Sequence, residues 1–147
     1  MDIIYLAKQL LTNYYFLSFF IAWFFACMLK SFIRTYQQDG RYDIRFGFRS
    51  GGMPSSHSAA VSAITVALFL KSGISTLFIV DLIFSLIIIS DSFGVRKNVG
   101  EQGDAINRWL KKSKGSSIKV VYGHSVLQVT FGILIGILVA SILFLAV

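Results

Sequence analysis

Four apolar segments divide the chain, and they constrain its fold more than any other feature of the sequence. They run from about Leu10 to Ile33, from Pro54 to Leu70, from Ile74 to Phe93, and from Val126 to the end. A helix that crosses a bilayer needs about 20 largely apolar residues. We therefore expect one domain, residues 1–147, with the fold of an all-α integral membrane protein. It would be a bundle of about four transmembrane helices.

The composition and the connections fit this expectation. Hydrophobic residues make up 55% of the chain and charged residues 14%, whereas a soluble domain carries about 25% charged residues. A tight turn at 71–73 joins the second and third segments, and long polar connections cover about 31–53 and 94–123. Four spans would place both long connections at one membrane face and both termini at the other.

Basic residues gather at the face with the long connections. Of the 14 Lys and Arg, all but Lys8 and Lys71 lie in or beside these connections. The positive-inside rule then predicts a multi-pass protein of the cell membrane with its basic loops and its site facing the cytoplasm. A site for anionic lipid headgroups would also collect basic residues. Charges at span ends do not suggest nucleic-acid binding.

The segment from Gly51 to Ser58, GGMPSSHS, combines glycine, proline, hydroxyl groups and a histidine just before an apolar segment. Glycine lets the backbone approach a ligand closely, and a helix N-terminus offers free N–H groups to an anion. His57 would lie in the first turn and could donate a proton. The same residue types also cap ordinary helices, so this pattern fits either an anion site or a plain helix start.

Other polar residues are expected near the same membrane face. Asp91 could orient a histidine or pair with Arg96, and His124 precedes the last span. Lys30 and Arg34 lie four residues apart, so they share a helix face. They could bind a phosphate or simply extend to the membrane surface, and the second interpretation is the favoured one for Arg34.

Three further patterns concern packing rather than chemistry. Asp81 lies near the middle of a span, where we expect a hydrogen bond to a neighbouring helix. Residues Gln102 to Leu110 fit a short amphipathic helix. Gly132 and Gly136 form a pair of small residues that is typical of close helix packing, and such packing permits a homodimer.

The ordered motifs resemble the divergent bacterial and plant branch of the type 2 phosphatidic acid phosphatase superfamily, which includes vanadium-dependent haloperoxidases. The resemblance rests on Gly51 to Ala59 and on the later motifs, and it covers about 30–136. Those later motifs are Asp91-x-x-Gly94-Val95-Arg96, Gly100-x-Gln102, Asn107, Gly123-His124 and Gln128-Val129.

The resemblance implies a phosphatase that needs no metal or cofactor. His57 would be the general acid and His124 the nucleophile that forms a phosphohistidine. Lys30 and Arg96 would stabilise the phosphoryl oxygens. The amides of Ser55 and Ser56, with Gly52 nearby, would surround the phosphate.

Three departures from the superfamily pattern qualify these roles. The superfamily arginine lies a few residues before the nucleophilic histidine, whereas a whole connection separates Arg96 from His124. Lys30 lacks the usual arginine-proline pair seven residues later, where this chain has Gln37, so Arg34, Arg45 or Arg49 could share its role. Gln128 replaces the usual carboxylate four residues after the second histidine, so either Asp91 supplies the negative charge or His124 is a weaker nucleophile here.

The expected substrate is a phospholipid or polyprenyl phosphate: a polyprenyl diphosphate, phosphatidylglycerophosphate or phosphatidic acid. The alternative, favoured by Gln128, is a protein that binds lipid or phosphate without turnover. Halide oxidation uses the same kind of pocket, but the chain's apolarity argues against it because known haloperoxidases are soluble.

Overall fold

The structure is a computed structural model that describes residues 2–37, 43–48, 51–113 and 115–146. In these ranges the chain forms helices and connecting segments, which confirms the expected all-helical fold. The elements in order are α1 (Ile3–Leu11), α2 (Tyr14–Gln37), the 3₁₀ turn η1 (Ile44–Phe46), α3 (Ser56–Ser72), α4 (Thr76–Phe93), α5 (Val95–Lys112) and α6 (Val126–Ala146).

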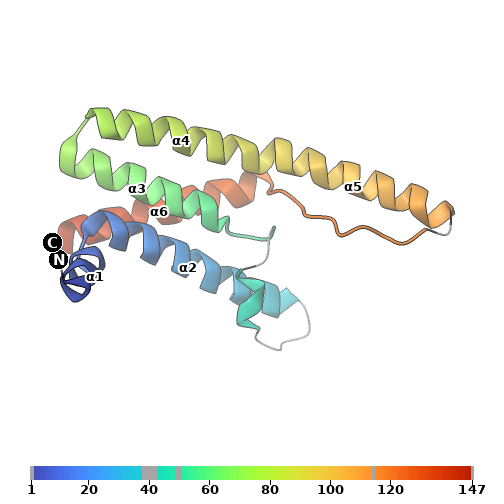
Figure 1. The fold of residues 1–147 in the computed structure, drawn as a ribbon, viewed down its shortest axis with the longest axis horizontal. Helices are drawn as coiled ribbons and strands as arrows, with labels where there is room; N and C mark the ends of the chain where they lie inside the picture. Colours follow the sequence, from blue (N-terminus) through green and yellow to red (C-terminus); the bar gives the residue numbers. More distant parts are fainter. Residues whose placement is uncertain (1, 38–42, 49–50, 114, 147) are drawn as a thin grey trace.

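Helices α2, α3, α4 and α6 run alongside one another as a bundle (Figure 1). The end of α2, the start of α3, the end of α4 and the start of α6 meet at one end of the bundle. Both termini lie at the other end. The expected placement of both long connections at one end is therefore confirmed.

Three helices of the described chain are long and apolar enough to cross a membrane. They are α2, the continuous stretch Thr76–Lys112, and α6. The expected second span is α3, which has only 17 residues and packs against α2, α4 and α6. At 1.5 Å per residue, the 37 residues of α4 and α5 extend for about 55 Å. Because the hydrocarbon core is about 30 Å thick, α5 extends beyond the membrane.

Small residues form the interior of the bundle, and large apolar residues face outward. Ala59, Ala63 and Ala67 of α3 are fully buried. A Cβ added to Gly136 of α6 would lie 2.5 Å from the Ala59 carbonyl oxygen and 2.8 Å from the Ala63 nitrogen. This close packing is typical of membrane helices, where small residues let the backbones approach. The packing expected from the glycine pair is confirmed.

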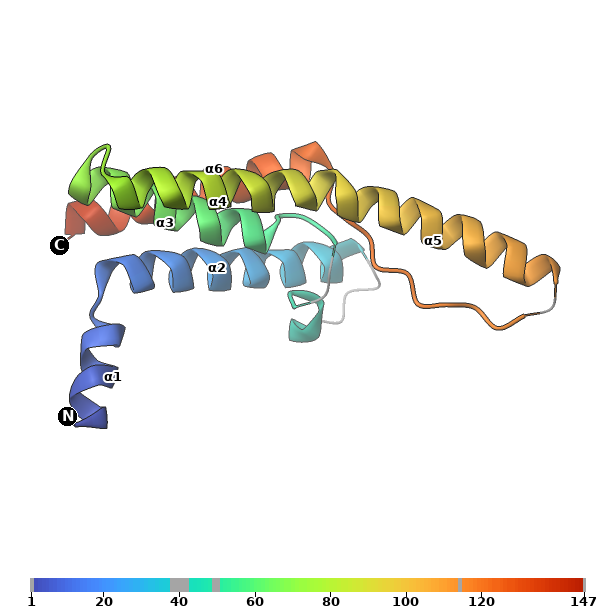
Figure 2. The same ribbon diagram turned by 45° about the horizontal axis from the view of Figure 1, so that its top comes forward.

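The N-terminal segment breaks into two helices where the sequence suggested one span starting near Leu10. The Asn13 side-chain oxygen accepts hydrogen bonds from the backbone N–H groups of Tyr15 and Phe16, at 3.0 and 3.1 Å. This is an N-cap, and it starts α2 independently of α1. Helix α1 turns away across the axis of the bundle (Figure 2). Its apolar side chains, including Ile3 and Leu11, are exposed.

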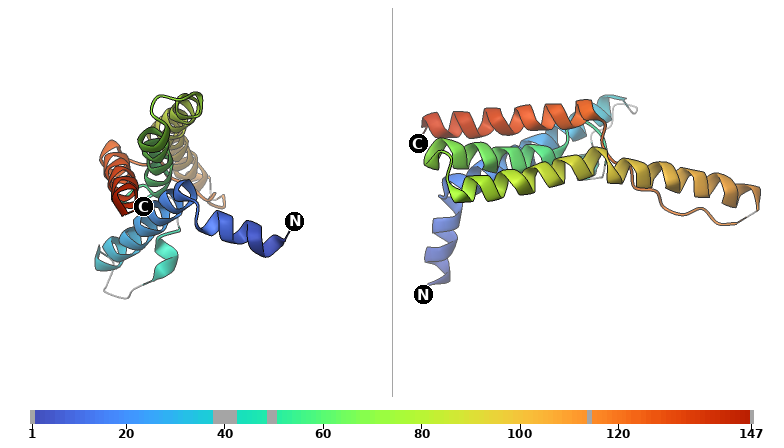
Figure 3. Two further views of the ribbon diagram at one scale, coloured as in Figure 1. Left: turned by 90° about the vertical axis from the view of Figure 1, so that its left-hand side faces the viewer. Right: turned by 90° about the horizontal axis from the view of Figure 1, so that it is seen from above.

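The second long connection differs from the expected loop with a short helix. Helix α5 continues the direction of α4 after an irregular residue, Gly94, and the chain then returns alongside α5 (Figure 3). The Asn107 side chain exchanges two hydrogen bonds with the Ile118 backbone, at 2.9 and 2.8 Å. The Tyr122 hydroxyl donates to Asp104 at 2.7 Å. The return segment, residues 115–125, thus hydrogen-bonds along α5 and supports the longer helix.

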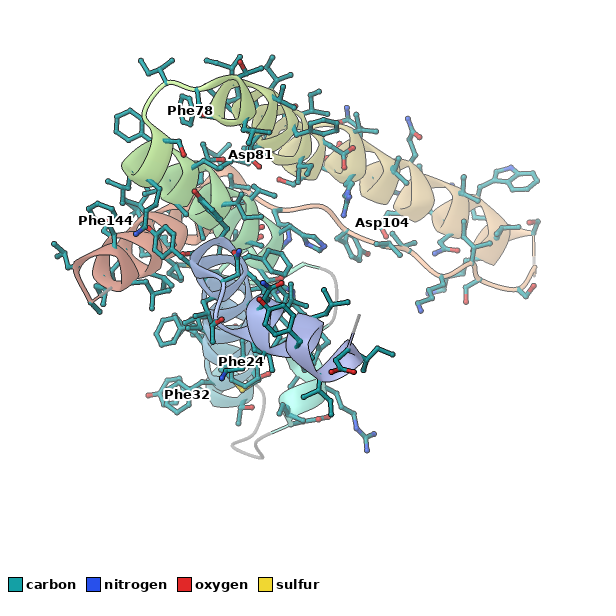
Figure 4. The ribbon with its side chains drawn as sticks, turned by 60° about the vertical axis from the view of Figure 1, so that its left-hand side comes forward. Phe24, Phe32, Phe78, Asp81, Asp104 and Phe144 are labelled. Atoms are coloured by element: carbon teal, nitrogen blue, oxygen red, sulfur yellow. The ribbon has the colours of Figure 1, made fainter. Side chains whose placement is uncertain are left out.

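Large apolar side chains lie on the outer surface of the bundle (Figure 4). Phe24 and Phe32 project outward from α2 and are 44% and 64% exposed.

Asp81 contacts α3, because the Thr65 hydroxyl lies 2.5 Å from its carboxyl oxygen and 2.9 Å from the Ser85 hydroxyl. The hydrogen bond expected for Asp81 is therefore present.

Candidate functional site

A cavity of about 250 Å³ lies at the end of the bundle that carries the long connections. Its walls come from α2, from the segment around η1, from the start of α3 and α5, and from the return segment. The described lining residues are Trp23, Cys27, Lys30, Gly47, Phe48, Gly51, Ser56, His57, Arg96, Val121, Tyr122 and His124. Both histidines and two of the expected cations therefore surround one space.

The start of α3 supplies His57 and free backbone donors. Gly51 and Gly52 have φ values of 77° and 86°, a conformation that glycine adopts without strain. The Ser55 side chain caps the helix by accepting from the Ser58 N–H at 3.3 Å. In the described chain, the N–H groups of Ser56 and His57 have no hydrogen-bond partner. These two amides are therefore available to an anion.

Ser55 does not have the role expected from the resemblance. Its N–H donates to the Gln128 carbonyl oxygen at 3.0 Å, and the residue is fully buried. Its amide is thus occupied, and its hydroxyl caps α3. Ser55 fixes α3 against α6, and its amide already has a backbone partner, unlike the phosphate-binding amide that the resemblance implies.

Lys30 is a buried cation with no acidic partner among the described residues. Its side chain is 2% exposed, and its ammonium group donates to the Ser56 hydroxyl at 3.4 Å. Gly52 lies against its stem, because a Cβ there would be 3.5 Å from the lysine Cγ. Burying a charge without a counterion is costly. An anionic ligand in the cavity would offset that cost.

His124 is 6% exposed and is held by its backbone and its ring. Its N–H donates to the Ser92 carbonyl oxygen at 2.8 Å, and its Nδ1 lies 3.2 Å from the Gln128 Oε1. The Ser125 N–H also donates to this Oε1, at 3.1 Å, which identifies the atom as the amide oxygen. Because that oxygen only accepts, Nδ1 carries the hydrogen and Nε2 keeps its lone pair.

The surroundings of His124 favour the neutral ring. Burial lowers the pKa of His124 most strongly, the hydrogen bond from its ring to Gln128 raises it, and the positive charges of Lys30 and His57 lower it further. Hydrogen bonding to the Gly52 backbone opposes the shift. A neutral imidazole whose Nε2 keeps its lone pair is the form that a nucleophile requires.

Asp91 orients Arg96 rather than a histidine. Its Oδ2 accepts from the Arg96 Nε at 2.6 Å. Gly123 lets the chain pass close to the junction of α4 and α5. A Cβ at this position would lie 2.5 Å from the Lys97 nitrogen and 2.7 Å from the Ser92 carbonyl oxygen. The ring of His124 contacts Gln128, so the negative charge expected from Asp91 is not placed at the second histidine.

The structure thus brings together His57, His124, Lys30, Arg96 and Ser56 at one cavity. Gly52 and Gln128 line an adjoining cavity instead. Sequence reasoning missed several walls of the first cavity. Trp23, Cys27 and Lys30 share one face of α2, and this spacing of four and three residues could have identified the first two.

Comparison with known proteins places this site in a family. The chain matches the Divergent PAP2 family over residues 11–139. It belongs to this family. The matched range includes every described residue that lines the first cavity.

One curated relative extends the comparison to a named protein. Over 112 residues the chain is 38% identical to "Uncharacterized membrane protein YuiD" of Bacillus subtilis (strain 168). The alignment covers 64% of this chain and 71% of that protein. No solved structure matches the chain. For this member of the Divergent PAP2 family, the site geometry therefore carries the functional argument.

Proposed function

We propose that this protein is a metal-independent lipid phosphatase that works through a phosphohistidine. The observation that carries the proposal is the cavity itself, where a buried, hydrogen-bonded histidine faces a second histidine and a buried lysine that has no acidic partner among the described residues. Membership of the Divergent PAP2 family supports it. The substrate would be a phosphate monoester or diphosphate on a lipid.

In the proposed reaction, the phosphoryl group binds between Lys30, Arg96 and the free amides at the start of α3. The Nε2 of His124 attacks phosphorus, and the bond from phosphorus to the lipid oxygen breaks. His57 gives its proton to that oxygen, so the lipid leaves as an alcohol or a monophosphate. Water then attacks the phosphohistidine, His57 takes the water's proton, and phosphate leaves.

Lys30 and Arg96 have different electrostatic roles in this scheme. Arg96 is partly neutralised by Asp91, which also fixes its direction. Lys30 has no carboxylate partner in the described chain, so its full charge faces the cavity. Fixed charges aimed at oxygen atoms that gain negative charge in the transition state are a large source of catalysis.

The test is phosphate release from the purified protein in detergent with a chelator present. The panel comprises a polyprenyl diphosphate, phosphatidylglycerophosphate and phosphatidic acid. We expect chelator-resistant turnover that is lost in His57→Ala and in His124→Ala, with Arg108→Gln on α5 as the matched control. Turnover that survives His124→Ala would refute the phosphohistidine.

A second function, binding without turnover, is favoured by Gln128, which orients His124 but carries no charge. It predicts that vanadate or phosphate binds while none of the three lipids is hydrolysed. The same panel with a vanadate-binding assay distinguishes the two functions.

We also propose that the site faces the cytoplasm, because the basic residues cluster at its end of the bundle. Cys27 is 1% exposed, so an added Ser113→Cys provides the reactive thiol. A membrane-impermeant maleimide should label this variant only after cells are permeabilised. Labelling in intact cells would reverse the orientation.

A further inference from the structure

A second cavity, of about 390 Å³, adjoins the first on the other side of Lys30. Its described lining residues are Lys30, Ile33, Arg34, Gln37, Gly52, Met53 and Gln128. Lys30 lines both cavities, and Gln128 connects the second cavity to the ring of His124. The two spaces therefore share a cation and a link to the proposed nucleophile.

Arg34 brings an unsatisfied donor to this second cavity. Its Nη1 is buried and has no hydrogen-bond partner in the part of the chain that the structure describes. The guanidinium lies over the Phe46 ring, 5.6 Å from the centroid. A cation–π contact uses the face of the guanidinium and leaves its N–H edge free. A buried charged donor without an acceptor is costly, which points to an absent ligand.

The charges around the two cavities are of one sign. None of the described residues that line either cavity is acidic. Lys30 and Arg34 lie four residues apart on one face of α2, about 6 Å along the helix axis. Two cations at this separation can each hold one phosphoryl group. An arginine edge is well suited to phosphoryl oxygens because it donates two parallel hydrogen bonds.

We propose that the second cavity binds a second phosphoryl group, so that the substrate is a lipid diphosphate. The inference rests on the proposed phosphatase function. The terminal phosphoryl group occupies the first cavity, against His124. The phosphoryl group attached to the lipid lies between Lys30 and Arg34, with Ile33 and Met53 as its apolar walls. Attack breaks the bond from the terminal phosphorus to the bridging oxygen, which takes the proton of His57, and the lipid leaves as a monophosphate.

The first experiment measures binding of inorganic phosphate and pyrophosphate to the full-length protein in detergent, by calorimetry. We expect pyrophosphate to bind about tenfold or more tightly than phosphate, because it gains a charged hydrogen-bond partner. Arg34→Gln should remove this preference and leave phosphate affinity within about twofold. Equal affinities in the wild type, or an equal loss of both ligands in the variant, would overturn the proposal.

Controls separate a local effect from misfolding. Arg108→Gln removes one positive charge from the exposed surface of α5 and should preserve the preference for pyrophosphate. Arg34→Lys keeps the charge but loses the paired donors, and we expect an intermediate preference. Both variants, and Arg34→Gln, are compared by thermal unfolding before binding is measured.

The second experiment distinguishes the source of the phosphoryl group. With lipid monophosphate and diphosphate of the same chain, Arg34→Gln should raise KM for the diphosphate about tenfold and leave the monophosphate unchanged. If instead Arg34 affects both substrates only when anionic phospholipid is added, the cavity binds a neighbouring headgroup and the proposal fails. A preference for pyrophosphate that depends on Arg34 in a protein without turnover would support the subsite and refute the phosphatase.

Discussion

The substitution Gln128→Glu tests how this site supports its nucleophile. The Gln128 Oε1 lies 3.2 Å from the His124 Nδ1 and also accepts from the Ser125 N–H. A glutamate oxygen at the same position would keep both hydrogen bonds and add a negative charge. As His124 attacks phosphorus its ring becomes positive, so the added charge stabilises the transition state more than the ground state.

The magnitude follows from the strengths of the two kinds of hydrogen bond. A neutral hydrogen bond contributes about 1 kcal/mol and one to a charged group about 1.5–3 kcal/mol. The net gain is therefore about 0.5–2 kcal/mol, and at 1.36 kcal/mol per tenfold change kcat rises roughly 2- to 30-fold. The introduced carboxylate would also face the second cavity, where it repels a phosphoryl group, so KM should rise.

The assay is steady-state phosphate release with kcat and KM determined separately, together with an NMR titration of His124. The pKa of His124 should rise in the glutamate variant, because a nearby negative charge favours the protonated ring. Gln128→Ala, which removes both hydrogen bonds, should lower kcat. If Gln128→Glu changes neither kcat nor the titration of His124, Gln128 does not support the nucleophile and this account of the site is wrong.

Three further predictions concern packing, charge and pH. Gly136→Val should lower the free energy of unfolding by about 1–3 kcal/mol, measured by thermal unfolding in detergent, because its side chain meets the α3 backbone; the exposed Ile137→Leu should change it little, and an unchanged Tm for the valine variant would contradict the packing. Lys30→Met should abolish turnover yet raise Tm, since it removes a buried charge without a carboxylate partner in the described chain; a lower Tm would show that Lys30 is stabilised by contacts other than a ligand. Because burial lowers the pKa of His124, its neutral form persists as pH falls through about 6.5, the ordinary histidine value, while His57 gains the proton that it needs to act as the acid; kcat/KM should therefore rise as pH falls through this value and decline only below it, and a decline that begins above that pH would refute the assignment.

The sequence predicted the end of the bundle at which the site lies because topology determines it. The tight turn after α3 and the long connections on either side bring His57, Arg96 and His124 to one face. The glycine pair in α6 likewise predicted close helix packing, since only small residues allow such close approach, and the structure shows α3 to be the partner. These inferences depend on the spacing of residues and on the lengths of the apolar segments, both of which can be read from the sequence.

Contacts between distant backbones were not visible in the chain. The Ser55 N–H is taken by the Gln128 carbonyl oxygen, a bond that depends on how closely α6 approaches α3. Whether Asp91 contacts Arg96 or a histidine depends on the direction that α5 takes after Gly94. The length of α5 was underestimated because its support comes from the return segment, which pairs with Asn107.

The turn between α1 and α2 has a consequence for the depth of the site in a membrane. A short helix that lies across the bundle axis with exposed apolar side chains suits the boundary between headgroups and hydrocarbon. From Tyr14, where α2 begins, to Lys30 the helix rises about 24 Å, most of the roughly 30 Å hydrocarbon thickness. If α1 lies at one surface, the length of α2 would hold the Lys30 ammonium near the phosphate layer of the opposite leaflet.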